Sequence, residues 1–253
     1  MVKRLSYIFI ALLMCSCELI KEEDRLIPLP QPEKSSARTH VLIEYTGFLC
    51  VNCPTASEIA QDLQQLYDSQ LIVVAMHPAS SPFTQGAAQF DYTCPAADTY
   101  FTLCGGNAQT AFPKGNIDLL PLDNNYLLDP SLWSAQMLRL SKDSTTVSID
   151  LTATIDTLTR QVNISSTLHA DSTKQLTVMY WLVEDSVLGA QRMPDGSNNM
   201  QYYHRHMLRA EYTSAPPFTL PANYTASHCT LVAVVQDSTH RILQAKQTSL
   251  KPL

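Results

Sequence analysis

Residues 41–54 read VLIEYTGFLCVNCP, and this stretch decides the first half of the fold. Its first six residues, VLIEYT, are apolar and rich in β-branched side chains, so they predict a buried strand. After a turn around Gly47 come Cys50 and Cys53, with two residues between them. From residue 56 to 67, apolar residues recur three and four positions apart, which predicts a helix with one buried face. The sequence therefore places a CxxC pair between a buried strand and the start of a helix.

A second apolar run, LIVVAM at residues 71–76, predicts a second buried strand. Strand, helix and strand in this order indicate a βαβ unit with a parallel sheet. Residues 78–112 are less regular and polar. Further along, Asp129 followed by Pro130 is a favourable start for another helix.

The hydrophobic period changes near Asp143. Apolar and polar residues alternate from Val147 to Ile155, which predicts a half-buried antiparallel strand. Further strands are predicted over residues 162–168, 176–183, 230–236 and 241–250, with a hairpin turn at 237–240. Short strands joined by polar turns, with almost no helix, predict an immunoglobulin-like β-sandwich over residues 143–253.

The composition excludes some classes of function. The chain has 253 residues, 45% of them hydrophobic, which is enough for a sizeable core. It carries 17 Lys plus Arg and 23 Asp plus Glu, a formal net charge of −6, which argues against a nucleic-acid partner. Neither GxGxxG nor GxxxxGK[ST] occurs. We expect no bound cofactor and no metal.

The first residues predict an export signal. Two basic residues precede an apolar run of ten, residues 5–14. That run is too short to cross a bilayer, which takes about 20 helical residues. Because Ser16 is a small residue directly before Cys17, residues 1–16 are interpreted as a lipoprotein signal peptide. Cys17 would then carry the lipid, including palmitate, and residues 17–38, rich in proline and acidic residues, would form a tether. An ordinary secreted or anchored segment is the alternative.

The CxxC pair is the sharpest chemical signal. The unpaired N–H groups and the positive dipole end of a helix stabilise a thiolate. Cys50, expected at the exposed edge of the helix start, would be the nucleophile, and Cys53, one turn in, the resolving thiol. Glu44, on the preceding strand, is the nearest carboxylate, and its side chain could face either way. A zinc site needs two further ligands, which only Cys94 and Cys104 could offer.

A family resemblance adds to this interpretation. Strand, turn, CxxC, helix, strand and a later proline before a short strand resemble the thioredoxin fold. The resemblance implies a thioredoxin-like α/β domain over residues 39–142, with 78–106 as an insertion. It also implies a cis proline against the CxxC pair that shapes a substrate groove. Pro113 is the matching position, and an ordinary trans turn proline is the alternative.

A narrower resemblance covers most of the mature chain. Residues 44–54, EYTGFLCVNCP, resemble the TGxxCxNCP signature of the twenty-eight-kilodalton outer-membrane lipoprotein family of Bacteroidetes. Residues 203–209, YHRHMLR, resemble its HxHxLR segment, and residues 231–237 with 242–245 resemble its closing hairpin. The resemblance implies a lipid-anchored protein of the outer membrane, on its periplasmic or cell-surface face.

The remaining cysteines allow several roles. Cys94 and Cys104 would form a structural disulfide that pins the insertion, worth roughly 2–4 kcal/mol. A second dithiol that passes electrons to the CxxC pair is the alternative. Cys229 begins an apolar strand and is interpreted as a buried, inert thiol. His204 and His206 would share a face of a strand and could bind a metal, although a structural role is favoured.

Two functions follow. The first is a thiol–disulfide oxidoreductase or redox partner of envelope proteins that carry thiols or disulfides, with Cys50 attacking, Cys53 resolving and Pro113 aligning the partner. The second is a non-enzymatic surface receptor or adhesin, as the family has been described. In that case the Cys50–Cys53 disulfide would be structural.

Overall fold

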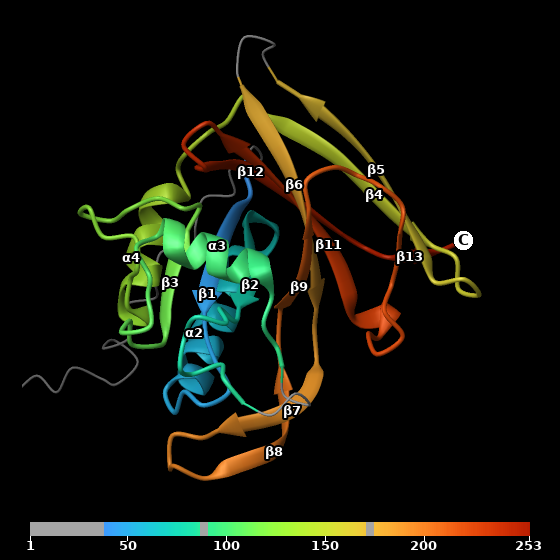
Figure 1. Ribbon diagram of the computed structural model, residues 1–253. Helices are drawn as coiled ribbons and strands as arrows, with labels where there is room; N and C mark the ends of the chain where they lie inside the picture. Colours follow the sequence, from blue (N-terminus) through green and yellow to red (C-terminus); the bar gives the residue numbers. More distant parts are fainter. Residues whose placement is uncertain (1–37, 87–90, 171–174) are drawn as a thin grey trace, which may run out of the picture. The chain divides into compact units, whose positions relative to one another are not determined.

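The computed structural model describes residues 38–86, 91–170 and 175–253, which form a mixed α/β fold (Figure 1). In this part of the chain the helices are α2 (Cys53–Tyr67), α3 (Pro95–Leu103) and α4 (Pro130–Leu140), with 3-10 turns η1 (Asp68–Gln70) and η3 (Ala226–His228). The signal peptide, Cys17 and nearly all of the predicted tether lie outside the described residues. No described helix combines the length and the apolar character that crossing a membrane requires.

Thirteen strands form three sheets among the described residues. They are β1 (His40–Tyr45), β2 (Leu71–Met76), β3 (Lys114–Ile117), β4 (Ser148–Ile155), β5 (Gln161–His169), β6 (Leu176–Glu184), β7 (Val187–Arg192), β8 (Asn198–His204), β9 (Met207–Tyr212), β10 (Phe218–Thr219), β11 (Cys229–Asp237), β12 (Ile242–Ser249) and β13 (Lys251–Pro252). The seven-stranded sheet has the order β12-β11-β6-β9-β2-β1-β3, the four-stranded sheet β10-β5-β4-β13, and the two-stranded sheet pairs β7 with β8.

The expected βαβ unit is present. β1 and β2 pair in parallel and α2 connects them, while β3 pairs antiparallel with β1. Asp129 is the N-cap of α4 and Pro130 opens it, as predicted. The predicted strands of the second half correspond to β4, β5, β6, β11 and β12, and the turn between β11 and β12 is also confirmed. The local hydrophobic pattern is therefore sufficient to predict these elements.

The largest sheet joins the two halves of the chain. β9 pairs in parallel with β2 through Ala75 and Met207, so strands from before and after the predicted boundary at residue 142 share one sheet. The division into domains at residues 39–142 and 143–253 stays a prediction. The shared sheet was not anticipated, because a pairing between residues so distant in sequence leaves no local pattern.

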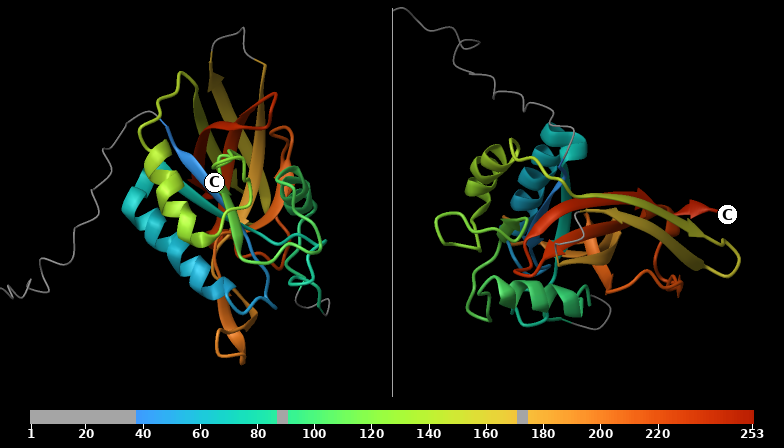
Figure 2. Two further views of the ribbon diagram at one scale, coloured as in Figure 1. Left: turned by 90° about the vertical axis from the view of Figure 1, so that its left-hand side faces the viewer. Right: turned by 90° about the horizontal axis from the view of Figure 1, so that it is seen from above.

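The sheet is covered differently on its two faces. One face carries a core that runs across both halves and includes Ile43, Val74, Trp181 and Val234, with α3 packed over it. On the other face, α2 and α4 cover β1, β2 and β3, and the four-stranded sheet covers β6 and β11. Figure 2 shows α3 on one side of the sheet and α2 with α4 on the other.

Arg38 belongs to the folded part, although the sequence suggested a tether up to this residue. Its guanidinium donates to Asp118 at 2.8 Å and to the carbonyl of Ile242 at 2.9 Å, and the residue is only 5% exposed. His40 Nδ1 lies 2.6 Å from the same carboxylate. This buried cluster fixes the start of β1 to the loop after β3 and to β12.

Candidate functional site

Cys50 and Cys53 form a disulfide at the carboxyl end of β1, with 5.4 Å between their Cα atoms. Cys53 is the first residue of α2, and Pro54 occupies its first turn. Proline suits this position because it lacks an N–H group that would otherwise need a partner. The placement of the CxxC pair between strand and helix matches the prediction.

The expectation of an exposed Cys50 is wrong, because Cys50 and Cys53 are each only 2% exposed. Part of the cover comes from the hairpin of β7 and β8, far along the chain, and part from the core that both cysteines share with residues of α3 (Figure 1 shows these elements). Gln191 Nε2 donates to the Cys50 carbonyl at 2.9 Å, and the Arg192 N–H donates to the Phe48 carbonyl at 2.7 Å.

The hairpin is itself held against the segment before α3. The hydroxyl of Tyr92 accepts a hydrogen bond from the Ala190 N–H at 3.1 Å, and its ring contacts Phe48 edge-on. Gly189 makes this approach possible, because a Cβ atom at that position would collide with the Tyr92 hydroxyl. The chain therefore holds the disulfide beneath a fitted cover.

Pro113 lies beside the CxxC pair. The Phe112–Pro113 peptide bond is cis, as predicted. Pro113 and Asn52, which lies between the two cysteines, line a common pocket of about 390 Å³. Phe112 belongs to the same core as Cys50 and Cys53. Pro113 thus lies near the loop that carries the two cysteines, and its role in redox chemistry stays a prediction.

Glu44 points toward the helix face of the sheet and lies under the start of α2. It lines a cavity of about 10 Å³ together with Cys53 and Ser57. The residue is 1% exposed, and its Oε1 has no hydrogen-bond partner in the described structure. Burial raises the pKa of the Glu44 carboxyl to about 8. The side chain can therefore hold a proton next to Cys53 at neutral pH.

Two histidines line the same cavity, and sequence reasoning did not connect either with the CxxC pair. His77 is 1% exposed, and within the described residues neither of its ring nitrogens has a hydrogen-bond partner. Its ring centroid lies 5.9 Å from that of His204, whose Nε2 donates to the Ala190 carbonyl at 3.1 Å. Burial lowers the pKa of His204 to about 4 and places the pKa of His77 well below its ordinary value.

The predicted pairing of His204 with His206 on one strand face is wrong. β8 ends at His204, and His206 has a left-handed backbone with φ of 53°, so the chain turns between them. Within the described residues, no group of three His, Cys, Asp or Glu side chains is placed to hold a metal ion.

The predicted disulfide between Cys94 and Cys104 is also wrong, since both are free and buried thiols. Cys94 is the N-cap of α3 and Cys104 its C-cap. A helix rises about 1.5 Å per residue, so ten steps separate the two Cα atoms by about 15 Å, whereas a disulfide needs roughly 4.4–6.8 Å. The Tyr45 hydroxyl donates a hydrogen bond to Cys104 Sγ at 3.4 Å. Burial raises the pKa of Cys104 to about 11, which makes it a poor nucleophile.

Cys229 is buried, as predicted, and is a free thiol. Burial, with a smaller effect of the nearby Glu184 carboxylate, raises the pKa of its thiol to about 12. An unreactive role in the core follows. Cys17, the predicted lipidation site, lies outside the described residues.

Comparisons with known proteins fit this architecture. The chain resembles HBP35 of Porphyromonas gingivalis, with 16% identity, 87% of this chain and 78% of that chain covered, and a TM-score of 0.63. It also resembles a protein of Agrobacterium tumefaciens, with 14% identity, 85% and 96% covered, and a TM-score of 0.50. At these identities the likeness concerns the fold alone. The search of curated proteins found no match.

A family model is more informative about relationship. The model of the outer membrane protein Omp28 matches residues 108–216, which include the cis proline and the hairpin that covers the disulfide. A domain of the outer membrane lipoprotein Omp28 from Porphyromonas gingivalis aligns with 19% identity over 43% of this chain and 90% of that domain, at a TM-score of 0.26. Over residues 108–216, the match to the family model means that the chain resembles the Omp28 family of outer membrane proteins.

Proposed function

We propose that this chain is an outer-membrane lipoprotein, anchored through Cys17, whose Cys50–Cys53 pair exchanges thiols and disulfides with envelope proteins. Residues 39–142 would be thioredoxin-like and residues 143–253 a β-sandwich. The parallel β1 and β2, the helix that begins at Cys53 and the cis proline beside Asn52 support the first assignment. The core shared by β4, β6 and β11 supports the second.

The chemistry uses two electrons. A partner thiolate attacks Cys50 Sγ, the bond between Cys50 and Cys53 breaks, and the Cys53 thiolate takes the proton of the Glu44 carboxyl. A second partner thiolate then attacks the partner's sulfur in the mixed disulfide, which releases Cys50 and an oxidised partner. In the reverse direction the Cys50 thiolate attacks a partner disulfide and forms the mixed disulfide, while Glu44 accepts the Cys53 proton. The Cys53 thiolate then attacks Cys50 Sγ, which releases the partner as a dithiol and re-forms the Cys50–Cys53 bond.

The observation that carries this proposal is the position of Glu44. A buried carboxyl with an unpartnered oxygen lowers the free energy of unfolding, and a disulfide that only braces the fold does not require such a group beside it. A resolving thiol does need a group that gives and accepts a proton. Glu44 lines a cavity with Cys53, and the raised pKa of its carboxyl, about 8, suits proton exchange with a thiol.

The test is equilibration of the full chain, without denaturant, with mixtures of reduced and oxidised glutathione, followed by maleimide labelling and intact-mass measurement. We expect the pair to equilibrate with a reduction potential above about −300 mV. Glu44→Gln should slow the exchange at least tenfold. Glu58→Gln, which changes an exposed carboxyl on α2, should leave the rate unchanged. Partners can be trapped as mixed disulfides with Cys53→Ser.

The burial of the disulfide supports a second candidate, a surface receptor or adhesin in which the Cys50–Cys53 bond only braces the fold. Both cysteines are 2% exposed, so attack requires movement of the groups that bury them, which include the β7–β8 hairpin and residues of α3. A disulfide that is reduced only in denaturant, at the same rate in Glu44→Gln and the parent chain, would establish this candidate and overturn the first.

A further inference from the structure

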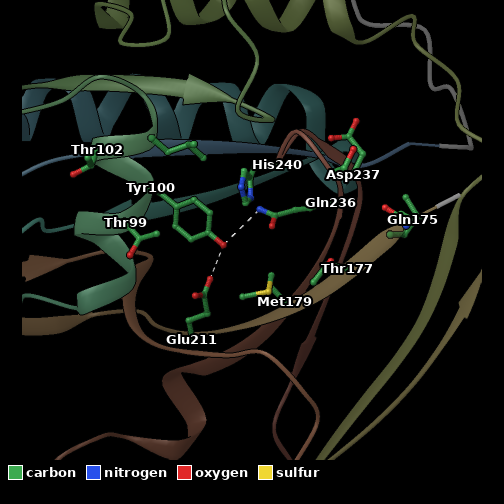
Figure 3. Close-up of a pocket in the computed structure, with 13 residues that line it drawn as sticks. Thr99, Tyr100, Thr102, Gln175, Thr177, Met179, Glu211, Gln236, Asp237 and His240 are labelled. Carbon is green, nitrogen blue, oxygen red and sulfur yellow. Dashed lines mark hydrogen bonds between the residues drawn. The ribbon is translucent and has the colours of Figure 1, made fainter.

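A second site lies on the opposite face of the sheet from Glu44, between α3 and strands β6, β9 and β11. It is a cavity of about 910 Å³, a size typical of ligand pockets. Figure 3 shows side chains from all four elements directed into one space. None of the residues predicted for the redox site lines this cavity.

A hydrogen-bond network forms the floor of the cavity around Glu211. The Tyr100 hydroxyl donates to Glu211 Oε2 at 2.5 Å, and Trp181 Nε1 donates to the same oxygen at 2.8 Å. Gln236 Nε2 in turn donates to the Tyr100 hydroxyl at 3.5 Å (Figure 3). Because both neighbours donate, Glu211 serves as an acceptor, which is the role of an ionised carboxylate.

Glu211 makes no ion pair among the described residues. No lysine or arginine lines the cavity; His240 is the basic side chain in its wall, and Asp237 adds a second carboxylate. Arg209, two residues before it on β9, is instead paired with Glu184 at 3.2 Å. Hydrogen bonds reach only Oε2, so Oε1 is left for a partner in the cavity. A half-buried carboxylate of this kind is stabilised by a cation.

The apolar side chains that line the cavity indicate which kind of cation would fit. Leu103, Leu176 and Met179 give the cavity an apolar side. An apolar stem can pack there while a charged end reaches Glu211. We propose that this cavity binds an organic cation, an ammonium or guanidinium group on a short alkyl stem, through Glu211. Such a group occurs on free polyamine-like molecules and on lysine and arginine side chains of other proteins.

The experiment uses a matched pair of probes, pentylguanidinium and its neutral isostere pentylurea, titrated into the full chain by calorimetry and tryptophan fluorescence. Trp181 is a direct reporter, because its indole N–H donates to Glu211. We expect saturable binding of pentylguanidinium, with pentylurea at least tenfold weaker, which corresponds to about 1.4 kcal/mol. A capped arginine tripeptide distinguishes the sources: equal binding indicates a protein side chain, and weaker binding a free cation.

Glu211→Gln should abolish the preference for the cation and keep the fold, since the amide oxygen can still accept from Tyr100 and Trp181. Thr177→Lys, at an exposed position of the cavity wall, should weaken binding of the probe, because the introduced ammonium group can itself reach the Glu211 carboxylate. Glu58→Gln is the control for net charge. Equal affinity for both probes, absence of binding, or unchanged selectivity in Glu211→Gln would each overturn the proposal.

Discussion

Glu44 and Glu211 are carboxylates on inner strands of one sheet, yet their surroundings are opposite. Glu44 lies on β1, under the start of α2, 1% exposed and with an unpartnered Oε1. Glu211 lies on β9, facing α3, and receives two donated hydrogen bonds at the floor of an open cavity. Burial without donors favours the protonated acid, whereas donors and solvent favour the anion.

The comparison shows how one sheet can hold two kinds of site. Around Glu44, Cys53 and His77 the cavity of about 10 Å³ has room for no more than a water molecule, so only a proton can move there. Around Glu211 the cavity of about 910 Å³ has room for a ligand. The first carboxyl is suited to proton exchange, and the second to recognition. Four predictions test this contrast.

The largest expected effect is the pH dependence of stability caused by Glu44. Its pKa of about 8 in the folded state is above the ordinary value of 4.5, so the folded chain holds a proton that the unfolded chain has lost. The contribution of Glu44 to the free energy of unfolding should therefore fall as pH rises from about 4.5 to 8. Over this whole range the free energy of unfolding should lose about 5 kcal/mol through Glu44, and about 2 kcal/mol of this loss falls between pH 6.5 and 8.

Urea unfolding at a series of pH values measures this slope. Glu44→Gln should remove this fall between pH 6.5 and 8, whereas the buried histidines, whose unfolded forms titrate around pH 6.5, contribute equally to the curves of both chains. Glu58→Gln should keep the parent slope, because Glu58 is exposed. A Glu44→Gln curve that still falls by about 2 kcal/mol would show that Glu44 is not the proton carrier.

The second effect, with the opposite sign, comes from His204. Its pKa of about 4 in the folded state is below the ordinary value of 6.5, because burial disfavours the charged ring. The contribution of neutral His204 to the free energy of unfolding is present above the ordinary pKa of 6.5. It falls by about 3 kcal/mol as pH falls toward 4. His77 acts in the same direction. His204→Gln should reduce the loss below pH 6.5, and exposed His228→Gln should not; equal slopes for the two variants would contradict the assignment.

Many of the helices and strands could be predicted because their signals are local. The apolar period over residues 56–67 gives α2, and the alternation from Val147 to Ile155 gives β4. The same alternation could have oriented Glu44, which lies two residues after the helix-facing Leu42 on β1. The helix between Cys94 and Cys104 also left a signal, with Pro95 at its start and apolar side chains at Ala96, Ala97, Tyr100 and Phe101.

Contacts between distant segments could not be predicted. Nothing around Gln191 indicates that it reaches the Cys50 carbonyl, 141 residues away. Tyr100 and Glu211 are 111 residues apart and meet only because α3 packs over β9. Both sites therefore depend on the shared sheet, which brings the late strands against the early ones.

The third prediction concerns the Glu211 network. Tyr100→Phe removes the hydroxyl that donates to Glu211 and leaves Trp181 as the remaining donor. Hydrogen bonds to charged groups contribute roughly 1.5–3 kcal/mol, so we expect a loss of about 2 kcal/mol in the free energy of unfolding. Tyr126→Phe, at an exposed tyrosine, is the matched control. A chain as stable as the parent would mean that Glu211 relies on Trp181 and solvent alone.

The smallest effect, on the cover of the disulfide, separates the two candidate functions. Gln191→Leu removes the hydrogen bond to the Cys50 carbonyl while keeping a side chain of similar size over it. If the hairpin opens to admit a partner, this loss of roughly 1 kcal/mol should speed reduction of the disulfide by dithiothreitol about fivefold without denaturant. Gln201→Leu, an exposed change on the same hairpin, should have no effect. Equal rates for both variants would instead mean that this bond does not hold the cover closed. A rate that rises with urea as steeply as global unfolding would show that reduction follows global unfolding, because a local opening exposes much less surface.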